Sequence, residues 1–88
     1  MNDFFNLVVM LQVDKEKTFG DYIKFMRSEH HLTQVDLAAK VTNNYQNISS
    51  LERNKFGPSL AYLYKLAEAF NMNIVEFIQG FEDFKNQK

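Results

Sequence analysis

Amide and hydroxyl side chains are concentrated between residues 44 and 50, where the chain reads Asn-Tyr-Gln-Asn-Ile-Ser-Ser. Gln and Asn can form two hydrogen bonds with the edge of an adenine, and Ser can donate to or accept from most bases. Two cations, Arg53 and Lys55, follow closely. These side chains could therefore hydrogen-bond to nucleic-acid bases and pair with phosphates. The same residue types are also common on solvated helix faces, so their meaning depends on the elements that carry them.

Residues suited to other kinds of chemistry are scarce in this chain. Its 88 residues include no Cys, which excludes a disulfide framework, a thiolate metal site and a Cys nucleophile. His30 and His31 are the only imidazoles, and two adjacent ligands make a poor metal site, so we expect neither metal nor cofactor. An enzyme is the least favoured class, because no nucleophile and base pair or carboxylate dyad has a supporting context.

The spacing of apolar residues from Thr18 onward predicts helices. Capping residues favour helix starts at Thr18, Thr33, Asn44 and Ser59. The expected helices cover residues 18–30, 34–41, 44–53, 59–70 and 74–80, and the last one ends at Gly80. The predicted inward positions are Phe19, Tyr22, Ile23, Met26, Leu37, Ala38, Val41, Ile48, Leu51, Leu60, Leu63, Leu66, Ala67, Phe70, Ile74, Phe77 and Ile78.

These elements indicate an all-α domain of five helices, since one Pro and three Gly argue against a turn-rich all-β fold. The second and third helices, joined by a tight turn at residues 42–44, form a helix-turn-helix. We expect residues 18–80 to make up the domain. Residues 1–17 are then an N-terminal extension, and residues 81–88 are a C-terminal tail.

Residues 18–78 resemble, without gaps, the Cro/cI-type (XRE) DNA-binding domain of phage repressors and restriction-modification controllers. The resemblance implies a five-helix, lambda-repressor-like fold. It also implies a sequence-specific transcriptional regulator, a dimeric repressor or autoregulator that reads a palindromic operator in double-stranded DNA. The segments that carry the resemblance are Thr33-Gln34, Leu37-Ala38, Ile48-Ser49-Ser50-Leu51-Glu52-Arg53, Pro58-Ser59-Leu60, Leu66-Ala67-Glu68-Ala69 and Ile74-Val75-Glu76-Phe77.

The resemblance also implies roles for particular residues. Gln34, Arg53 and Lys55 match positions that contact DNA phosphates, and Arg27 and Glu52 match a structural ion pair between the first and third helices. The third helix would enter the major groove. The positions implied for base contact are Asn44, Tyr45, Gln46, Asn47, Ser49 and Ser50.

The turn between the second and third helices departs from the family pattern. Thr42 stands where the family has Gly in a left-handed conformation, which a β-branched residue disfavours. Asn43 stands where an apolar residue commonly packs inward, and it offers an alternative left-handed position. The angle between the two helices, and with it the register of base contacts, depends on this turn.

Charge and the chain ends bear on assembly and location. Residues 18–57 carry five basic and four acidic side chains, so one monomer binds phosphates only modestly and we expect DNA binding by a homodimer. No signal peptide or membrane span is evident, which predicts a cytoplasmic protein. An apolar N-terminal segment either packs on its own core or pairs with its copy, with help from Phe77, Phe81 and Phe84. Its apolar residues are Phe4, Phe5, Leu7, Val8, Val9, Met10 and Leu11.

A second class of function competes with DNA binding. The net charge of −1, the departures at Thr42 and Asn43 and the apolar N-terminal segment favour a protein-interaction module on the same fold, such as an antitoxin-like partner or an adaptor. Arg53, Lys55 and the amide-rich third helix oppose it. Co-purification of a second polypeptide at fixed stoichiometry would discriminate between the two.

Overall fold

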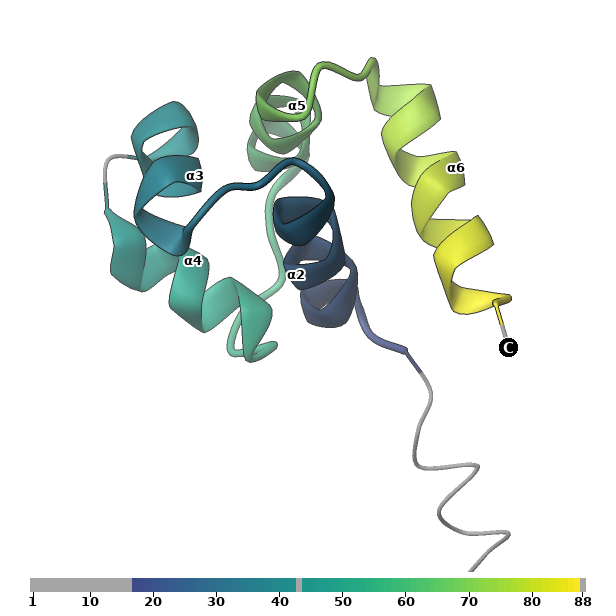
Figure 1. The fold of residues 1–88 in the computed structure, drawn as a ribbon, viewed down its shortest axis with the longest axis horizontal. Coiled ribbons are helices and arrows are strands. Elements are labelled where there is room, and N and C mark those ends of the chain that lie inside the picture. Colours follow the sequence, from purple (N-terminus) through teal and green to yellow (C-terminus); the bar gives the residue numbers. More distant parts are fainter. Residues whose placement is uncertain (1–16, 43, 88) are drawn as a thin grey trace, which may run out of the picture.

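The computed structural model describes residues 17–42 and 44–87, and this part of the chain forms five helices and no strand. They are α2 (Phe19–Glu29), α3 (Gln34–Val41), α4 (Tyr45–Glu52), α5 (Leu60–Ala69) and α6 (Ile74–Lys85). In Figure 1, α3 and α4 lie at one side, α6 at the other, and α2 and α5 between them. The predicted all-α class and the helix-turn-helix of α3 and α4 are confirmed. The apolar N-terminal segment and Asn43 lie outside the described residues.

Each helix begins at a polar capping residue. The side chains of Thr18, Thr33, Asn44, Ser59 and Asn73 each accept a hydrogen bond from a backbone N–H of the first turn. In α2, α3 and α6 the acidic residue at the third helical position accepts a hydrogen bond from the backbone N–H of the capping residue. The first four caps are the predicted ones, because capping depends on local sequence.

Three helices end in a left-handed residue that is not glycine. His31, Asn54 and Asn71 have φ of 57°, 59° and 59° and follow α2, α4 and α5. In each case the next N–H bonds back to a carbonyl in the last turn, as from Lys55 N to Ser50 O at 2.9 Å. Asn tolerates this conformation better than most residues with a Cβ, which explains how a chain with three Gly turns sharply between helices.

The core lies where α2, α3, α4, α5 and α6 meet. Most of the predicted inward residues are buried there, but Leu60 is 66% exposed and Ile78 is 38% exposed, so these two predictions were wrong. Both lie at the edge of an apolar stripe, where periodicity alone does not separate a covered from an uncovered position. The buried hydrophobic residues are Tyr22, Ile23, Met26, Leu37, Ala38, Val41, Ile48, Leu51, Leu66, Ala67, Phe70, Phe77 and Phe84.

The last helix does not end at Gly80, as predicted, but continues to Lys85. A Cβ on Gly80 would lie 2.5 Å from the hydroxyl oxygen of Tyr22, so this glycine lets α6 approach α2 rather than ending a helix. The extended helix carries Phe81 and Phe84 onto the aromatic rings of Phe19 and Tyr22. Phe77 and Phe84 are buried within the chain itself, which corrects the suggestion that they help a dimer interface, whereas Phe81 is half-buried and its part in an interface stays a prediction.

Candidate nucleic-acid interface

The α3–α4 corner is fixed by a wedge of small and branched side chains. Ala38 is 3% exposed where the helices cross, and Ile48 and Leu51 are 0% and 1% exposed on the inner face of α4. A larger residue than Ala38 would push the two helices apart. Because α4 buries this face, its opposite face is held outward in a defined orientation.

The outward face of α4 carries the hydrogen-bonding residues. Tyr45, Gln46 and Asn47 are exposed, whereas Ser49 and Ser50 are half-buried. Asn44 is exposed too, but its side-chain oxygen accepts from Gln46 N at 3.0 Å and caps the helix. Five of the six expected residues thus lie on α4 and the sixth, Asn44, caps it, and three of the six are exposed and free of a capping role.

The departure at Thr42 is accommodated without a left-handed backbone at that residue. Thr42 has φ of −133°, an ordinary value. Its hydroxyl accepts from Asn44 N at 3.0 Å and lies 3.1 Å from Asn44 O, to which it donates. The expected alternative at Asn43 lies outside the described residues.

The buried carboxylate of Glu52 binds two other predicted site residues, Arg27 and Gln34. Glu52 is 2% exposed, and its Oε2 lies 2.5 Å from Arg27 Nε while its Oε1 accepts from Arg27 Nη2 at 3.0 Å. Arg27 Nη1 also donates to Leu32 O at 3.0 Å. The hydrogen bond to Glu52 raises the pKa of Arg27 above its usual value. The expected ion pair between α2 and α4 is therefore present, and Glu52 has a structural role.

Gln34 takes part in the same network, which sequence reasoning did not anticipate. Its Nε2 donates to Glu52 Oε1 at 3.0 Å, so the amide faces inward and one N–H is occupied. Close by, hydrogen bonds from the Thr33 backbone and side chain lower the pKa of Asp36, and this carboxylate places negative charge in the first turn of α3. A phosphate contact from Gln34 would have to use the second N–H of its amide.

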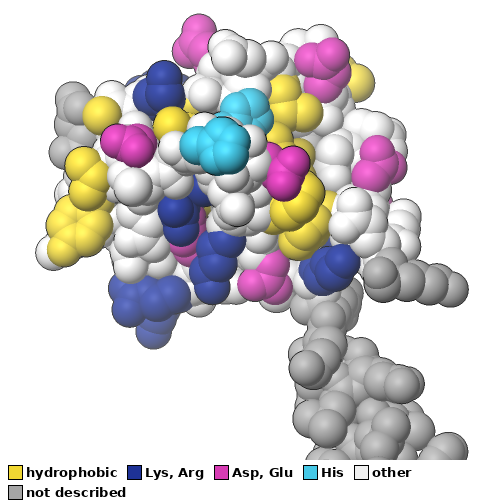
Figure 2. Space-filling model, in the orientation of Figure 1, with side chains coloured by type: hydrophobic (Ala, Val, Ile, Leu, Met, Phe, Trp, Pro, Cys, Tyr) yellow, Lys and Arg dark blue, Asp and Glu magenta, His cyan; other side chains and the backbone are white. Residues whose placement is uncertain are grey.

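Cations flank the exposed face of α4. Arg53 and Lys55 are exposed, and Arg53 Nε donates to Ser49 O at 3.3 Å, which holds the guanidinium along the helix. Figure 2 shows Lys and Arg side chains gathered over α4 and the adjoining part of α2. This arrangement can combine hydrogen bonding to bases with charge pairing to a phosphate backbone.

Asn54 is a site-forming residue that sequence reasoning missed. Its Oδ1 accepts from Gly20 N and its Nδ2 donates to Thr18 Oγ1, both at 3.0 Å, so the end of α4 is tied to the start of α2. Gly20 is required at this contact, because a Cβ there would collide with the backbone carbonyl of Glu52. In the sequence Asn54 is an ordinary turn residue between two helices, and nothing there indicates its contact with Gly20, 34 positions away.

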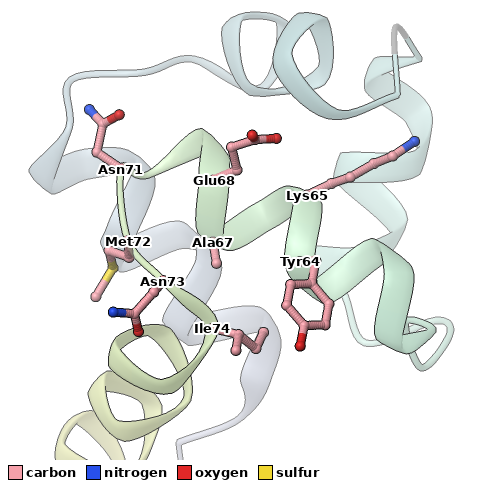
Figure 3. A pocket seen from close by; sticks show the side chains of 8 residues that line it. All are labelled: Tyr64, Lys65, Ala67, Glu68, Asn71, Met72, Asn73 and Ile74. Carbon is pink, nitrogen blue, oxygen red and sulfur yellow. The ribbon is translucent and has the colours of Figure 1, made fainter.

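Other parts of the described structure offer less chemistry. The open hollow between α5 and α6, about 620 Å³, is lined by Tyr64, Ala67 and the turn at Asn71–Ile74, and Lys65 extends away from that turn (Figure 3). Within residues 17–42 and 44–87 no three His, Asp or Glu side chains gather as metal ligands would. Among the described helices, none has the length and apolarity needed to cross a bilayer.

Comparison with known proteins gives consistent matches over the helical domain. The sequence model of the helix-turn-helix family matches residues 23–77. An uncharacterized HTH-type transcriptional regulator of Methanocaldococcus jannaschii is 41% identical over 61 residues, which cover 69% of this chain and 91% of that protein. One from Sinorhizobium fredii is 35% identical over 66 residues, 75% of this chain and 86% of that protein. The immunity repressor protein of Bacillus phage phi105 is 37% identical over 57 residues, 65% of this chain and 40% of the repressor.

Proposed function

Because the chain belongs to the XRE family of helix-turn-helix transcriptional regulators, a DNA-binding class and not an enzyme class, we propose that it is a sequence-specific, dimeric repressor or autoregulator. It acts in the cytoplasm on a palindromic operator. In this proposal α4 enters the major groove, and two copies read half-sites about one helical turn apart.

The observation that carries the proposal is the exposed start of α4. Tyr45, Gln46 and Asn47 project from a helix whose other face is fixed by Ile48, Leu51 and the Glu52 network. Because the helix itself is held in place, only its exposed side chains lose conformational freedom when they bond base edges, so this arrangement favours direct readout. Ser49 and Ser50 lie one turn further on, within reach of the next bases, and Asn44 supports the helix start.

Dimerisation supplies the affinity that one protomer lacks. Gln34, Arg53 and Lys55 are the phosphate contacts in this proposal, and three contacts per protomer give weak binding near physiological salt. A symmetric dimer doubles these contacts and imposes the two-fold symmetry of its operator.

The direct test is selection of bound duplexes from a random DNA pool by the full chain near physiological salt. We expect an enriched palindrome whose half-site centres lie about 10 base pairs apart. Binding that depends on salt but enriches no sequence would overturn the proposal, because it would leave only the electrostatic contribution. Under that outcome the protein-interaction module becomes the better hypothesis.

Variants of two neighbouring residues test how the contacts are divided. We expect Gln46→Ala to relax preference at one base pair, with a loss of about 1–3 kcal/mol of discrimination there. Arg53→Ala should weaken binding to all sequences and reduce the salt dependence of the binding constant by about one unit per protomer. Gln79→Ala, an exposed amide on α6, is the control and should leave binding unchanged. The same uniform loss for Gln46→Ala and Arg53→Ala would contradict these roles.

A further inference from the structure

An exposed apolar surface adjoins the start of α4. Val35 and Tyr45 are 62% and 51% exposed, and together with Ala38 and Ala39 they line a shallow hollow of about 190 Å³. Figure 2 shows hydrophobic side chains at this rim of the molecule, beside α3 and the first turn of α4. The hollow is apolar although it borders a face made of amides and hydroxyls.

The position of Tyr45 connects this surface to the proposed reading face. Tyr45 is the first residue of α4, so its ring enters the groove wherever Gln46 and Asn47 reach base edges. Four residues line this hollow, far fewer than the roughly 20–30 per partner of a stable protein interface, and the lining is mostly apolar, so neither a protein nor a phosphate is a fitting occupant. The 5-methyl group of thymine is the apolar group that the bases present in the major groove.

We propose that Tyr45, backed by Val35 and Ala39, is a specificity-determining residue that receives the 5-methyl group of a thymine. This inference rests on the proposed function and names the base feature that the start of α4 selects. The ring of Tyr45 supplies the apolar contact, so its hydroxyl is not required for the preference.

The experiment replaces each thymine of the selected operator in turn by deoxyuridine, which removes only the methyl group. We expect one position per half-site at which the full-length protein binds about fourfold more weakly, the factor for losing one buried methyl contact. Tyr45→Ala should bind thymine and uracil operators equally at that position. Tyr45→Phe should keep the discrimination, because its ring is retained.

The matched control is Tyr64→Ala, since Tyr64 is 53% exposed on α5, away from α4. It should discriminate uracil from thymine as the unaltered protein does. Insensitivity to uracil at every position, or undiminished sensitivity in Tyr45→Ala, would overturn the inference while the selected operator still supports the proposed function. If no operator is selected, both the proposed function and this inference are overturned.

Discussion

At the scale of single residues, Glu52 is the group on which the interface geometry most depends. Its carboxylate is buried, and it accepts from Arg27 on α2 and Gln34 on α3 while belonging to α4. A buried charge is tolerated only when its partners satisfy it, so these three helices keep one relative arrangement. Glu52 therefore helps to hold α4, the helix that carries Gln46 and precedes Arg53, without belonging to its exposed face.

Removal of Arg27 should be costly for this reason. We expect Arg27→Ala to lower the free energy of unfolding by about 3–5 kcal/mol, since it leaves an uncompensated buried carboxylate. Lys24→Ala, an exposed cation on the same helix, should change it by less than about 0.5 kcal/mol. Urea denaturation measures both variants. A loss for Arg27→Ala as small as that for Lys24→Ala would show that the pair contributes little.

At the scale of elements, two glycines decide how closely the helices approach. Gly20 lets α2 meet the end of α4, and Gly80 lets α6 meet Tyr22 on α2. The Tyr22 hydroxyl donates to Phe77 O at 2.7 Å, and burial, with a smaller contribution from Asp83, raises the pKa of Tyr22 to about 12. The phenol therefore stays neutral and hydrogen-bonded through the pH range in which DNA binding is measured.

We expect Gly80→Ala to destabilise the protein by about 1–3 kcal/mol, because the new methyl group collides with the Tyr22 hydroxyl. In a Tyr22→Phe background the nearest atom is the ring carbon at 3.5 Å, an ordinary contact. There the same change should be neutral, or stabilising by up to about 1 kcal/mol, from better helix propensity. Denaturation of the unaltered protein, the two single variants and the double variant gives the coupling energy between positions 22 and 80. Equal costs in both backgrounds would contradict the close approach.

Asn54 combines a left-handed backbone with two side-chain hydrogen bonds, and variants separate the two effects. Asn54→Gly keeps the backbone and loses the bonds, so we expect a loss of about 1–2 kcal/mol in stability. Asn54→Ala should lose about 1 kcal/mol more, because alanine disfavours φ of 59°. Asn71→Gly is the control, since Asn71 shares this φ but has no side-chain hydrogen bond among the described residues. Thermal denaturation ranks the stabilities of the three variants. Equal losses for Asn54→Gly and Asn71→Gly would show that the side-chain hydrogen bonds of Asn54 contribute nothing to stability.

At the scale of the whole molecule, charge is divided between two ends. Residues 58–87 carry two basic and four acidic side chains, whereas residues 18–57 carry five basic and four acidic ones. Residues 58–87, which include α6, therefore sum to −2, whereas residues 18–57, which include α4, sum to +1. The overall charge of −1 conceals this asymmetry, and we expect the asymmetry to orient the protein as it approaches DNA.

The proposed dimer predicts a strict dependence on operator geometry. Insertion of five base pairs between the half-sites turns one of them by about half a helical turn, so a rigid dimer can no longer engage both. We expect a loss of most of the cooperative affinity, with binding to an isolated half-site unchanged. Gel-shift titration of the two duplexes measures this. Equal affinity for both would indicate that monomers bind independently.

The sequence by itself determined the helices and the helix-turn-helix, because both depend on short-range physics. Capping residues such as Thr18 and Thr33 bond to amides three positions away, and apolar periodicity marks the buried faces of α2 to α5. The resemblance to the XRE family added the Arg27 and Glu52 pair, which the structure contains. The base and phosphate contacts of the α4 face stay predictions.

Only the tertiary structure decided the contacts between distant positions. Gly80 has the local signature of a helix end, yet its place opposite Tyr22 makes it an interior residue of α6. Asn54 has the signature of a turn, yet it ties α4 to α2, and the amide of Gln34 turns inward to Glu52. Whether Phe84 joins the core or an interface likewise depends on where α6 packs. A residue's local preference is set by its sequence neighbours, whereas its partners are set by packing of the whole chain.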